Sequence, residues 1–116
     1  MNAGAKKLAL HCAKIAGAKK GNRIAVLDIR HVSEIADYFV LASGGSQTHV
    51  RAMAEEIVAK NESVLGQSAF RVEGLREGNW VVMDYVDVVV HLFTDMARQY
   101  YNLEKLWGDA KKIGKS

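Results

Sequence analysis

The stretch WVVMDYVDVVVHLF, residues 80–93, decides the fold because it predicts two neighbouring strands. Residues 80–85 and 87–93 are rich in valine and aromatic residues, which pack well on a pleated surface and favour strands. Only one residue separates the two runs, too few for a helix between them. The stretch therefore predicts a tight antiparallel hairpin.

The register of this hairpin depends on its turn. A tip at Tyr85-Val86 places Asp84 opposite Asp87, and the same pairing places Trp80 opposite His91. Facing like charges repel modestly, so such an acid pair suits an exposed turn or a nearby cation. Valine is poor in a two-residue hairpin turn because such turns need positive φ.

Period-two alternation then divides the hairpin side chains between two faces. One face is a plain apolar core: Val81, Met83, Val88, Val90 and Leu92. The other face has an apolar centre, an aromatic residue, a histidine and two acids: Trp80, Val82, Asp84, Asp87, Val89 and His91. Two interpretations stay open for this second face. It is a surface that holds another protein, or a helix covers Trp80 and His91 is an ordinary buried histidine.

The flanking sequence supplies further elements. Apolar residues at helical spacing predict helices over 3–19 and, after an N-cap at Ser46, up to about residue 60. Strands are predicted over 23–29, 37–43 and 69–74. A last helix begins at Thr94 or Asp95 and ends at Gly108, and its predicted apolar stripe is Met96, Tyr100, Leu103 and Trp107. The order αββαβββα predicts an α/β (α+β) fold with a mixed five-stranded sheet flanked by helices.

The chain length and composition suit a single domain. The chain has 116 residues, of which 49% are hydrophobic and 25% charged, a globular balance. We expect one domain over 1–110 and a flexible basic tail over 111–116. No apolar run is long enough for a membrane helix, no signal peptide is evident, and one cysteine excludes an intrachain disulfide. A cytoplasmic protein is expected.

The charge is distributed unevenly along the chain. Residues 1–30 carry seven basic side chains and one acidic one, whereas residues 31–107 carry six basic and eleven acidic ones. A nucleic-acid binder concentrates basic charge on its working surface. An acidic body better suits a basic protein partner.

Residues that could carry chemistry lack the spacing that chemistry needs. The four histidines show no metal-binding spacing, Cys12 falls in a helical apolar stripe, and no serine sits in a nucleophile elbow. The turn SGGS, residues 43–46, favours a cap over a phosphate site because no phosphate-binding motif is present. We therefore expect neither an enzyme nor a metal or other cofactor. The alternative hypothesis is a nucleotide-handling protein that uses SGGS for phosphate and Asp84 with Asp87 for Mg²⁺.

Four separated motifs carry a resemblance to a known family: DYFVLASGGSQTHV (37–50), EG (73–74), WVVMDYVDVVVHLF (80–93) and YYNLEKLWGDA (100–110). In order and spacing they resemble the ribosomal silencing factors, the Iojap-related family of bacteria and organelles. The resemblance covers roughly residues 4–110. It implies a nucleotidyltransferase-like fold without enzyme activity. It also implies a translation repressor that binds the large ribosomal subunit through ribosomal protein L-fourteen and blocks joining of the small subunit when nutrients are scarce.

The same resemblance implies a partner-binding surface at the hairpin. The matching positions are Glu73, Trp80, Tyr85, His91 and Tyr101, with possible electrostatic contacts from Asp84 and Asp87. Relatives commonly have glycine after the residue that matches Tyr85, whereas this chain has Val86, which puts the role of Tyr85 in doubt. The family also implies a homodimer in solution, with no membrane partner and no sequence-specific nucleic-acid partner.

Overall fold

The computed structural model describes residues 3–101 and 111–115 of the chain. The helices are α1 (Ala3–Ala18), α2 (Gln47–Leu65) and α3 (Asp95–Tyr101). The strands are β1 (Asn22–Asp28), β2 (Tyr38–Gly44), β3 (Arg71–Glu73), β4 (Trp80–Asp84), β5 (Val88–Thr94) and β6 (Lys111–Lys115). None of the helices in this described part is long and apolar enough to cross a membrane.

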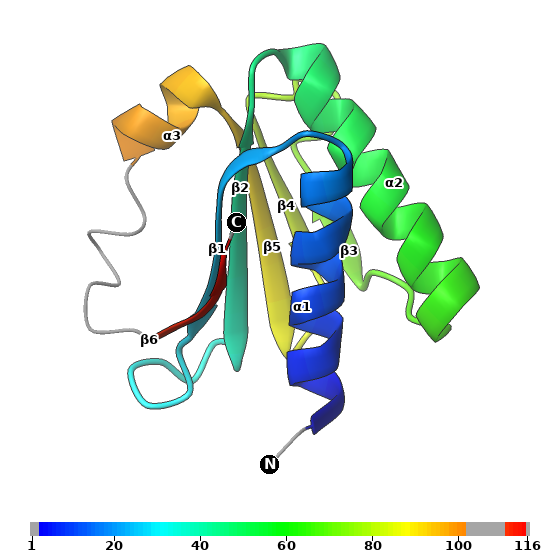
Figure 1. The fold of residues 1–116 in the computed structure, drawn as a ribbon, viewed down its shortest axis with the longest axis vertical. Helices are drawn as coiled ribbons and strands as arrows, with labels where there is room; N and C mark the ends of the chain where they lie inside the picture. Colours follow the sequence, from blue (N-terminus) through cyan, green and yellow to red (C-terminus); the bar gives the residue numbers. More distant parts are fainter. Residues whose placement is uncertain (1–2, 102–110, 116) are drawn as a thin grey trace.

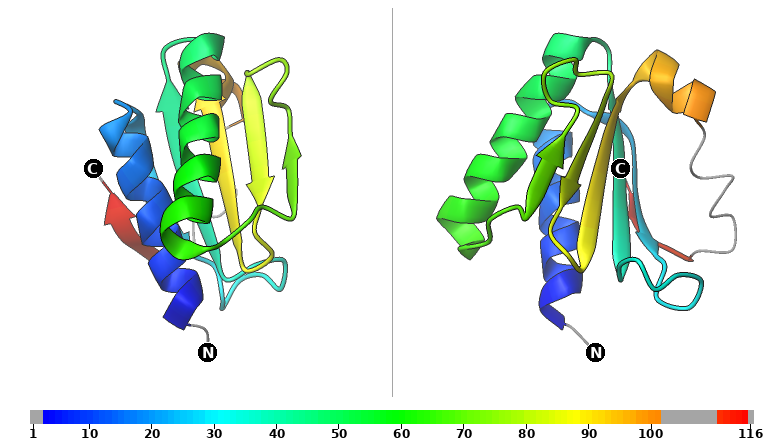
Figure 2. Two further views of the ribbon diagram at one scale, coloured as in Figure 1. Left: turned by 90° about the vertical axis from the view of Figure 1, so that its right-hand side faces the viewer. Right: turned by 180° about the vertical axis from the view of Figure 1, so that it is seen from behind.

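The strands form one mixed sheet in the order β3-β4-β5-β2-β1-β6. The pair β2 and β5 is parallel and the other neighbours are antiparallel. Helices α1 and α2 cover one face of the sheet, and α3 lies on the opposite side (Figures 1 and 2). The predicted mixed five-stranded sheet with helices against it is confirmed, and β6 adds a sixth strand at one edge.

Local sequence explains where the helices begin and end. The Ser46 hydroxyl accepts a hydrogen bond from the His49 N–H at 3.0 Å, which confirms the predicted N-cap of α2. The helix ends at Leu65 and is capped by Gly66, whose φ of 64° is the left-handed conformation that glycine adopts without steric cost. The predicted end near residue 60 is therefore five residues early. Helix α1 ends at Ala18, one residue before the predicted end at Lys19, which is exposed. Its buried side consists of Ala5, Leu8, Ala9, Cys12, Ile15 and Ala16.

The hairpin register differs from the prediction by two residues. Trp80 pairs with Phe93, Val82 with His91, and Asp84 with Val89, so the predicted facing pairs Asp84–Asp87 and Trp80–His91 are wrong. The reason is a turn centred one residue later, since the Tyr85 N–H donates to the Val88 carbonyl at 2.8 Å. A shift of two residues preserves the alternation, so the predicted division into two faces is confirmed for the residues of β4 and β5. Asp87, predicted on the second face, lies instead in the turn between the strands, beside Tyr85 and the start of α1.

The turn at the tip of the hairpin is strained. Val86 has a φ of 75°, and the Asp87 N–H donates to the Tyr85 carbonyl at 2.9 Å around it. This is a γ-turn with positive φ, which is uncommon in general and costly for a β-branched residue. The strain falls where the family resemblance implies glycine.

The C-terminal segment also differs from the prediction. Residues Lys111–Lys115 form β6, which pairs antiparallel with β1. The side chain of Ile113 packs against the main core, which is the larger buried cluster formed by α1, α2 and the sheet residues that face them. The predicted flexible tail over 111–116 therefore does not match the structure. An unpaired β1 edge offers a row of backbone donors and acceptors, and a polar segment can satisfy them without an apolar pattern of its own.

Helix α3 turns a different side to the sheet from the one predicted. Met96 and Tyr100 are 82% and 80% exposed, so the prediction of an apolar stripe through them is wrong. Ala97 and Arg98 lie against the sheet instead. Leu103 and Trp107, the other two residues of the predicted stripe, lie outside the described residues. Thr94 is the N-cap, because its hydroxyl accepts from the Ala97 N–H at 3.2 Å.

Candidate partner-binding surface

The sheet face opposite α1 and α2 carries a cluster of aromatic side chains. We call it the aromatic face and define it by Phe39, Trp80, Val82, Val89, His91 and Phe93. Its members come from the alternate positions of β2, β4 and β5. Trp80 and Val82 are only half-buried, whereas the other four are buried. The aromatic face therefore keeps partly accessible apolar surface at β4.

Ring contacts hold this cluster in one arrangement. The Trp80 ring stacks on Phe93 with centroids 5.3 Å apart. The Phe39 and His91 rings meet edge to face at 4.8 Å, and His91 lies 6.2 Å from Phe93. Such offset and edge contacts add to the free energy of area burial. Trp80 is thus positioned before any partner arrives.

A hydrogen bond fixes the orientation of both Trp80 and His91. The Trp80 Nε1–H donates to His91 Nδ1 at 3.1 Å, so the imidazole is neutral with its proton on Nε2. That Nε2 atom is buried and has no hydrogen-bond partner within the described part of the chain. Burial lowers the pKa of His91 to about 4, because the charged imidazolium would lose its hydration. His91 therefore stays neutral at physiological pH.

The two acids of the hairpin serve the turn in different ways. The Asp84 carboxylate accepts a hydrogen bond from the Val86 N–H at 2.7 Å. The Asp87 backbone carbonyl accepts from the N–H groups of Asp37 and Tyr38, at 2.8 and 3.1 Å. Asp84 thus helps to hold the strained turn, and Asp87 connects the hairpin to the loop before β2.

The structure brings three of the five predicted partner-binding residues to one face. Glu73 pairs with Val82, so its exposed side chain lies beside Trp80 and His91 on the aromatic face. Tyr85 points to the opposite side of the sheet, where it is 8% exposed in the core under α1. Burial raises the pKa of its phenol. Tyr101 is the last residue of α3, and its side chain lies outside what the structure describes.

The glycine of the EG motif makes a close approach to this surface. Gly74 has a φ of 83°, and a Cβ atom there would lie 2.1 Å from the Trp80 carbonyl oxygen. Only glycine tolerates both the positive φ and the contact. Gly74 therefore lets the chain turn beside the start of β4.

Sequence reasoning missed a buried arginine beside the aromatic face. Arg98 is 1% exposed; its Nη1 donates to the Ser43 hydroxyl at 2.9 Å, and its guanidinium lies 5.9 Å from the Phe93 ring centroid. A cation over an aromatic ring is attracted by the ring electrons. No spacing motif signals this contact, because Ser43 and Arg98 are far apart in sequence. Phe93, one step beyond His91 in the same alternation, could have been placed on this face from the sequence.

A polar cluster in the main core accounts for Cys12. The buried Asn61 amide donates to the Cys12 sulfur at 3.3 Å, and its oxygen lies 2.8 Å from His11 Nδ1. Burial raises the pKa of Cys12 to about 11, so the thiolate that a nucleophile needs is scarce. Cys12 acts as a core residue of α1.

The residues of the nucleotide-handling hypothesis do not form one site. The SGGS turn begins with the last two residues of β2 and leads into α2 (Figure 1). Asp87 instead contacts Tyr38 at the other end of β2. A strand of this length separates the turn from the acids by roughly 20 Å. Among residues 3–101 and 111–115, no three histidine, cysteine or acidic side chains come together as metal ligands would.

Comparisons with known proteins give a consistent result. Residues 2–116 match the family described as "Ribosomal silencing factor during starvation". The chain is 45% identical over 101 residues to ribosomal silencing factor RsfS of Bacillus subtilis, covering 84% of this chain and 85% of that protein. It is 33% identical over 86 residues to "Mitochondrial assembly of ribosomal large subunit protein 1" of Mus musculus, covering 72% of this chain and 38% of that one. A crystal structure from Chromobacterium violaceum superposes with a TM-score of 0.86 at 28% identity, covering 100% of this chain and 93% of that one.

Proposed function

Because the chain belongs to the ribosomal silencing factor family, we propose that it represses translation by occupying ribosomal protein L-fourteen on the large subunit. Occupying that protein blocks joining of the small subunit, and the repressor acts under nutrient limitation in the cytoplasm. The mechanism is steric and uses no cofactor. The name of the mouse relative, which refers to the large subunit, supports the choice of subunit.

The observation that carries this proposal is the preorganised Trp80. Its ring is stacked on Phe93 and its N–H is bonded to His91, yet it stays half-buried. Tryptophan is enriched at the energetic centres of protein interfaces, since it buries a large area with little loss of conformational freedom. A side chain already fixed in place costs still less entropy when a partner binds.

The charge around Trp80 supports a basic partner. Glu73 is exposed, and its one salt bridge to another described residue is a long contact of 3.9 Å with Arg71, between two side chains that are both more than half exposed. Such an exposed pair contributes little, so Glu73 can exchange Arg71 for a partner cation. Asp84 adds a second carboxylate on the same face. We propose that Glu73, Trp80 and His91 form the contact and that Asp84 and Asp87 add long-range attraction.

Of the two remaining residues predicted to contact the partner, Tyr85 is left out of the proposed interface and Tyr101 is kept. Tyr85 supports the hairpin from the core side, so a direct contact with the partner is not part of the proposed interface. Tyr101 remains a proposed contact because α3 lies on the same side of the sheet as the aromatic face (Figure 2). A homodimer in solution, which would cover the same apolar surface when no ribosome is present, is also proposed.

Subunit binding and joining assays test the proposal. The protein is expected to co-sediment with isolated large subunits, not with small subunits, and to reduce formation of joined ribosomes when it is added before mixing. It should also bind purified protein L-fourteen. Co-sedimentation with small subunits alone, or undiminished subunit joining at saturating protein, would contradict the proposed mechanism.

A further inference from the structure

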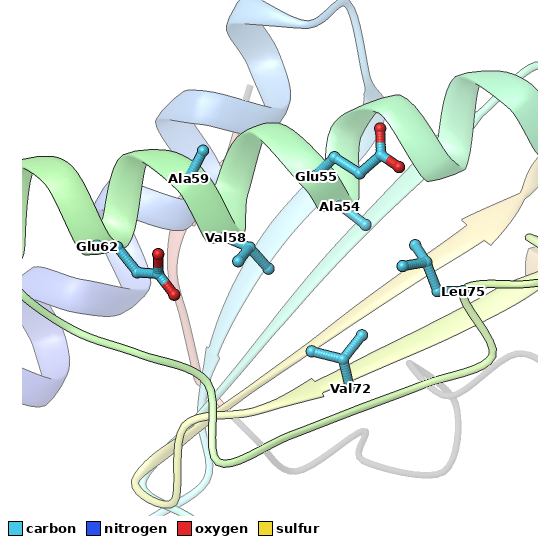
Figure 3. A pocket seen from close by; sticks show the side chains of 7 residues that line it. All are labelled: Ala54, Glu55, Val58, Ala59, Glu62, Val72 and Leu75. Atoms are coloured by element: carbon cyan, nitrogen blue, oxygen red, sulfur yellow. The ribbon is translucent and has the colours of Figure 1, made fainter.

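A second open surface lies on the other side of the sheet, between α2 and β3. Its volume is about 320 Å³, room for one or two large side chains. Figure 3 shows the apolar side chains that line it, together with Glu55 and Glu62 of α2. We call it the α2 groove and define it by Ala54, Val58, Ala59, Val72 and Leu75, with Glu55 and Glu62 at its rim.

The groove exists because α2 does not cover the edge of the sheet. The helix packs on β2, β4 and β5, whereas β3 is a three-residue edge strand beyond them. Val58, Val72 and Leu75 pack against the main core but remain only partly buried. Apolar surface therefore faces solvent along one side of α2.

The charges on the rim follow a regular pattern along α2. Glu55 and Glu62 are both exposed and are seven residues, or two helical turns, apart. Their Cα atoms are therefore about 10 Å apart along the helix axis. Val58 and Ala59 lie between them at the third and fourth positions. Within the described residues neither glutamate forms a salt bridge, so both carboxylates can accept a partner cation.

We propose that the α2 groove binds a basic amphipathic helix of a partner protein. Along α2 the groove presents an acid, two apolar residues and a second acid at positions i, i+3, i+4 and i+7. A partner helix lying beside α2 complements this pattern when it carries two basic residues at i and i+7 and two apolar residues at i+3 and i+4. Two leucine-sized side chains enter between α2 and Val72, and the flanking lysines or arginines meet Glu55 and Glu62. An extended strand fits less well, because its same-face side chains recur every ~6.7 Å and miss a 10 Å spacing.

The groove and the aromatic face can be occupied at once. Val72 pairs with Met83 and faces the helices, whereas its neighbour Glu73 pairs with Val82 and faces the other way. The sheet separates the two surfaces. The proposal for the groove therefore stands or falls independently of the ribosome contact through Trp80.

Peptide binding tests the groove directly. The probe is a capped helical peptide with the core Lys-x-x-Leu-Leu-x-x-Lys and alanines elsewhere, and binding is followed by amide chemical shifts in NMR. We expect the largest shifts at Val58, Val72 and Leu75, with little change at Trp80. Glu55→Lys with Glu62→Lys should weaken binding at least tenfold, since it replaces two attractions with two repulsions.

Matched controls separate this site from general charge attraction. Glu34→Lys with Glu56→Lys changes net charge equally on side chains that do not line the groove, and it should leave affinity within about twofold. A peptide with glutamates in place of the lysines should bind at least tenfold more weakly. Equal losses in both double variants, equal binding of the acidic peptide, or shifts centred on Trp80 would overturn the proposal. So would self-association of the free protein that the Glu55/Glu62 variant abolishes, because a second copy would then be the occupant.

Discussion

The indole N–H of Trp80 donates to Nδ1 of His91 at 3.1 Å, on the diagonal between β4 and β5. This bond needs a neutral imidazole, because a protonated Nδ1 cannot accept. The charge state of one buried histidine is therefore coupled to the position of the tryptophan at the centre of the proposed interface.

This coupling predicts a pH-dependent stability. The pKa of His91 is about 4 in the folded protein and about 6.5 in an unfolded chain. The unfolded state therefore binds the proton more readily. Stability from this group is fully present above pH 6.5 and is lost as the pH falls from 6.5 to 4. The loss at the lower end is on the order of 2–3 kcal/mol of unfolding free energy.

Denaturant titrations between pH 4 and 7.5 check this prediction against His91→Gln, which retains a side-chain acceptor for the indole. Between pH 6.5 and 4, the unfolding free energy of the variant should fall less steeply with decreasing pH than that of the wild type. Asp28, whose pKa is lowered to about 2 by its bond with Arg30, contributes in a lower pH window. Identical slopes for both proteins would show that His91 titrates normally.

Val86→Gly should stabilise the protein. The substitution removes the steric cost of a β-branched residue at φ 75°, about 1–2 kcal/mol. Glycine also increases the conformational entropy of the unfolded chain, which offsets part of this gain in stability. A net gain of about 0.5–1 kcal/mol corresponds to a rise of a few degrees in Tm. The matched control is Val64→Gly, at an exposed valine within α2, which should lower Tm. A decrease in Tm for Val86→Gly would mean that the turn is not strained.

Removing residues 111–116 should destabilise the protein, although the sequence alone predicts no effect. The deletion unpairs β1 along its outer edge and removes the partly buried Ile113 from the core. We expect a loss of about 1–2 kcal/mol, with faster amide hydrogen exchange in β1 and unchanged exchange in β4. Unchanged exchange in β1 would show that β6 does not pair with it in solution.

The sequence predicts most of the fold because its strands alternate regularly. Val81 and Val82 fall on the correct faces even though the register is wrong, since a two-residue shift preserves parity. The register itself depends on a γ-turn with positive φ at Val86, which no propensity favours. Strand β6 cannot be recognised from the sequence because it lacks an alternating apolar pattern. It forms through backbone pairing with the edge of β1, which does not require such a pattern.

The candidate site is only partly predictable for similar reasons. Trp80 and His91 share a face by alternation, but their hydrogen bond depends on the true register. Tyr85 follows the same alternation to the opposite face, so parity alone separates it from the other two. The Arg98–Ser43 contact joins distant segments, and only the packing of α3 on the sheet reveals it.

In the proposed function, Trp80 anchors the protein to the large subunit. The most direct measurement is the affinity of Trp80→Ala for isolated large subunits, with circular dichroism and thermal unfolding to confirm that the variant is folded. The control is Phe70→Ala, which removes an exposed aromatic side chain. Phe70 lies two residues before Val72, and the side chain of Val72 faces the helices. We predict that Trp80→Ala loses about 2 kcal/mol of binding, roughly thirtyfold, and that Phe70→Ala binds like the wild type. A folded Trp80→Ala protein that binds large subunits and blocks subunit joining as well as the wild type would contradict the claim.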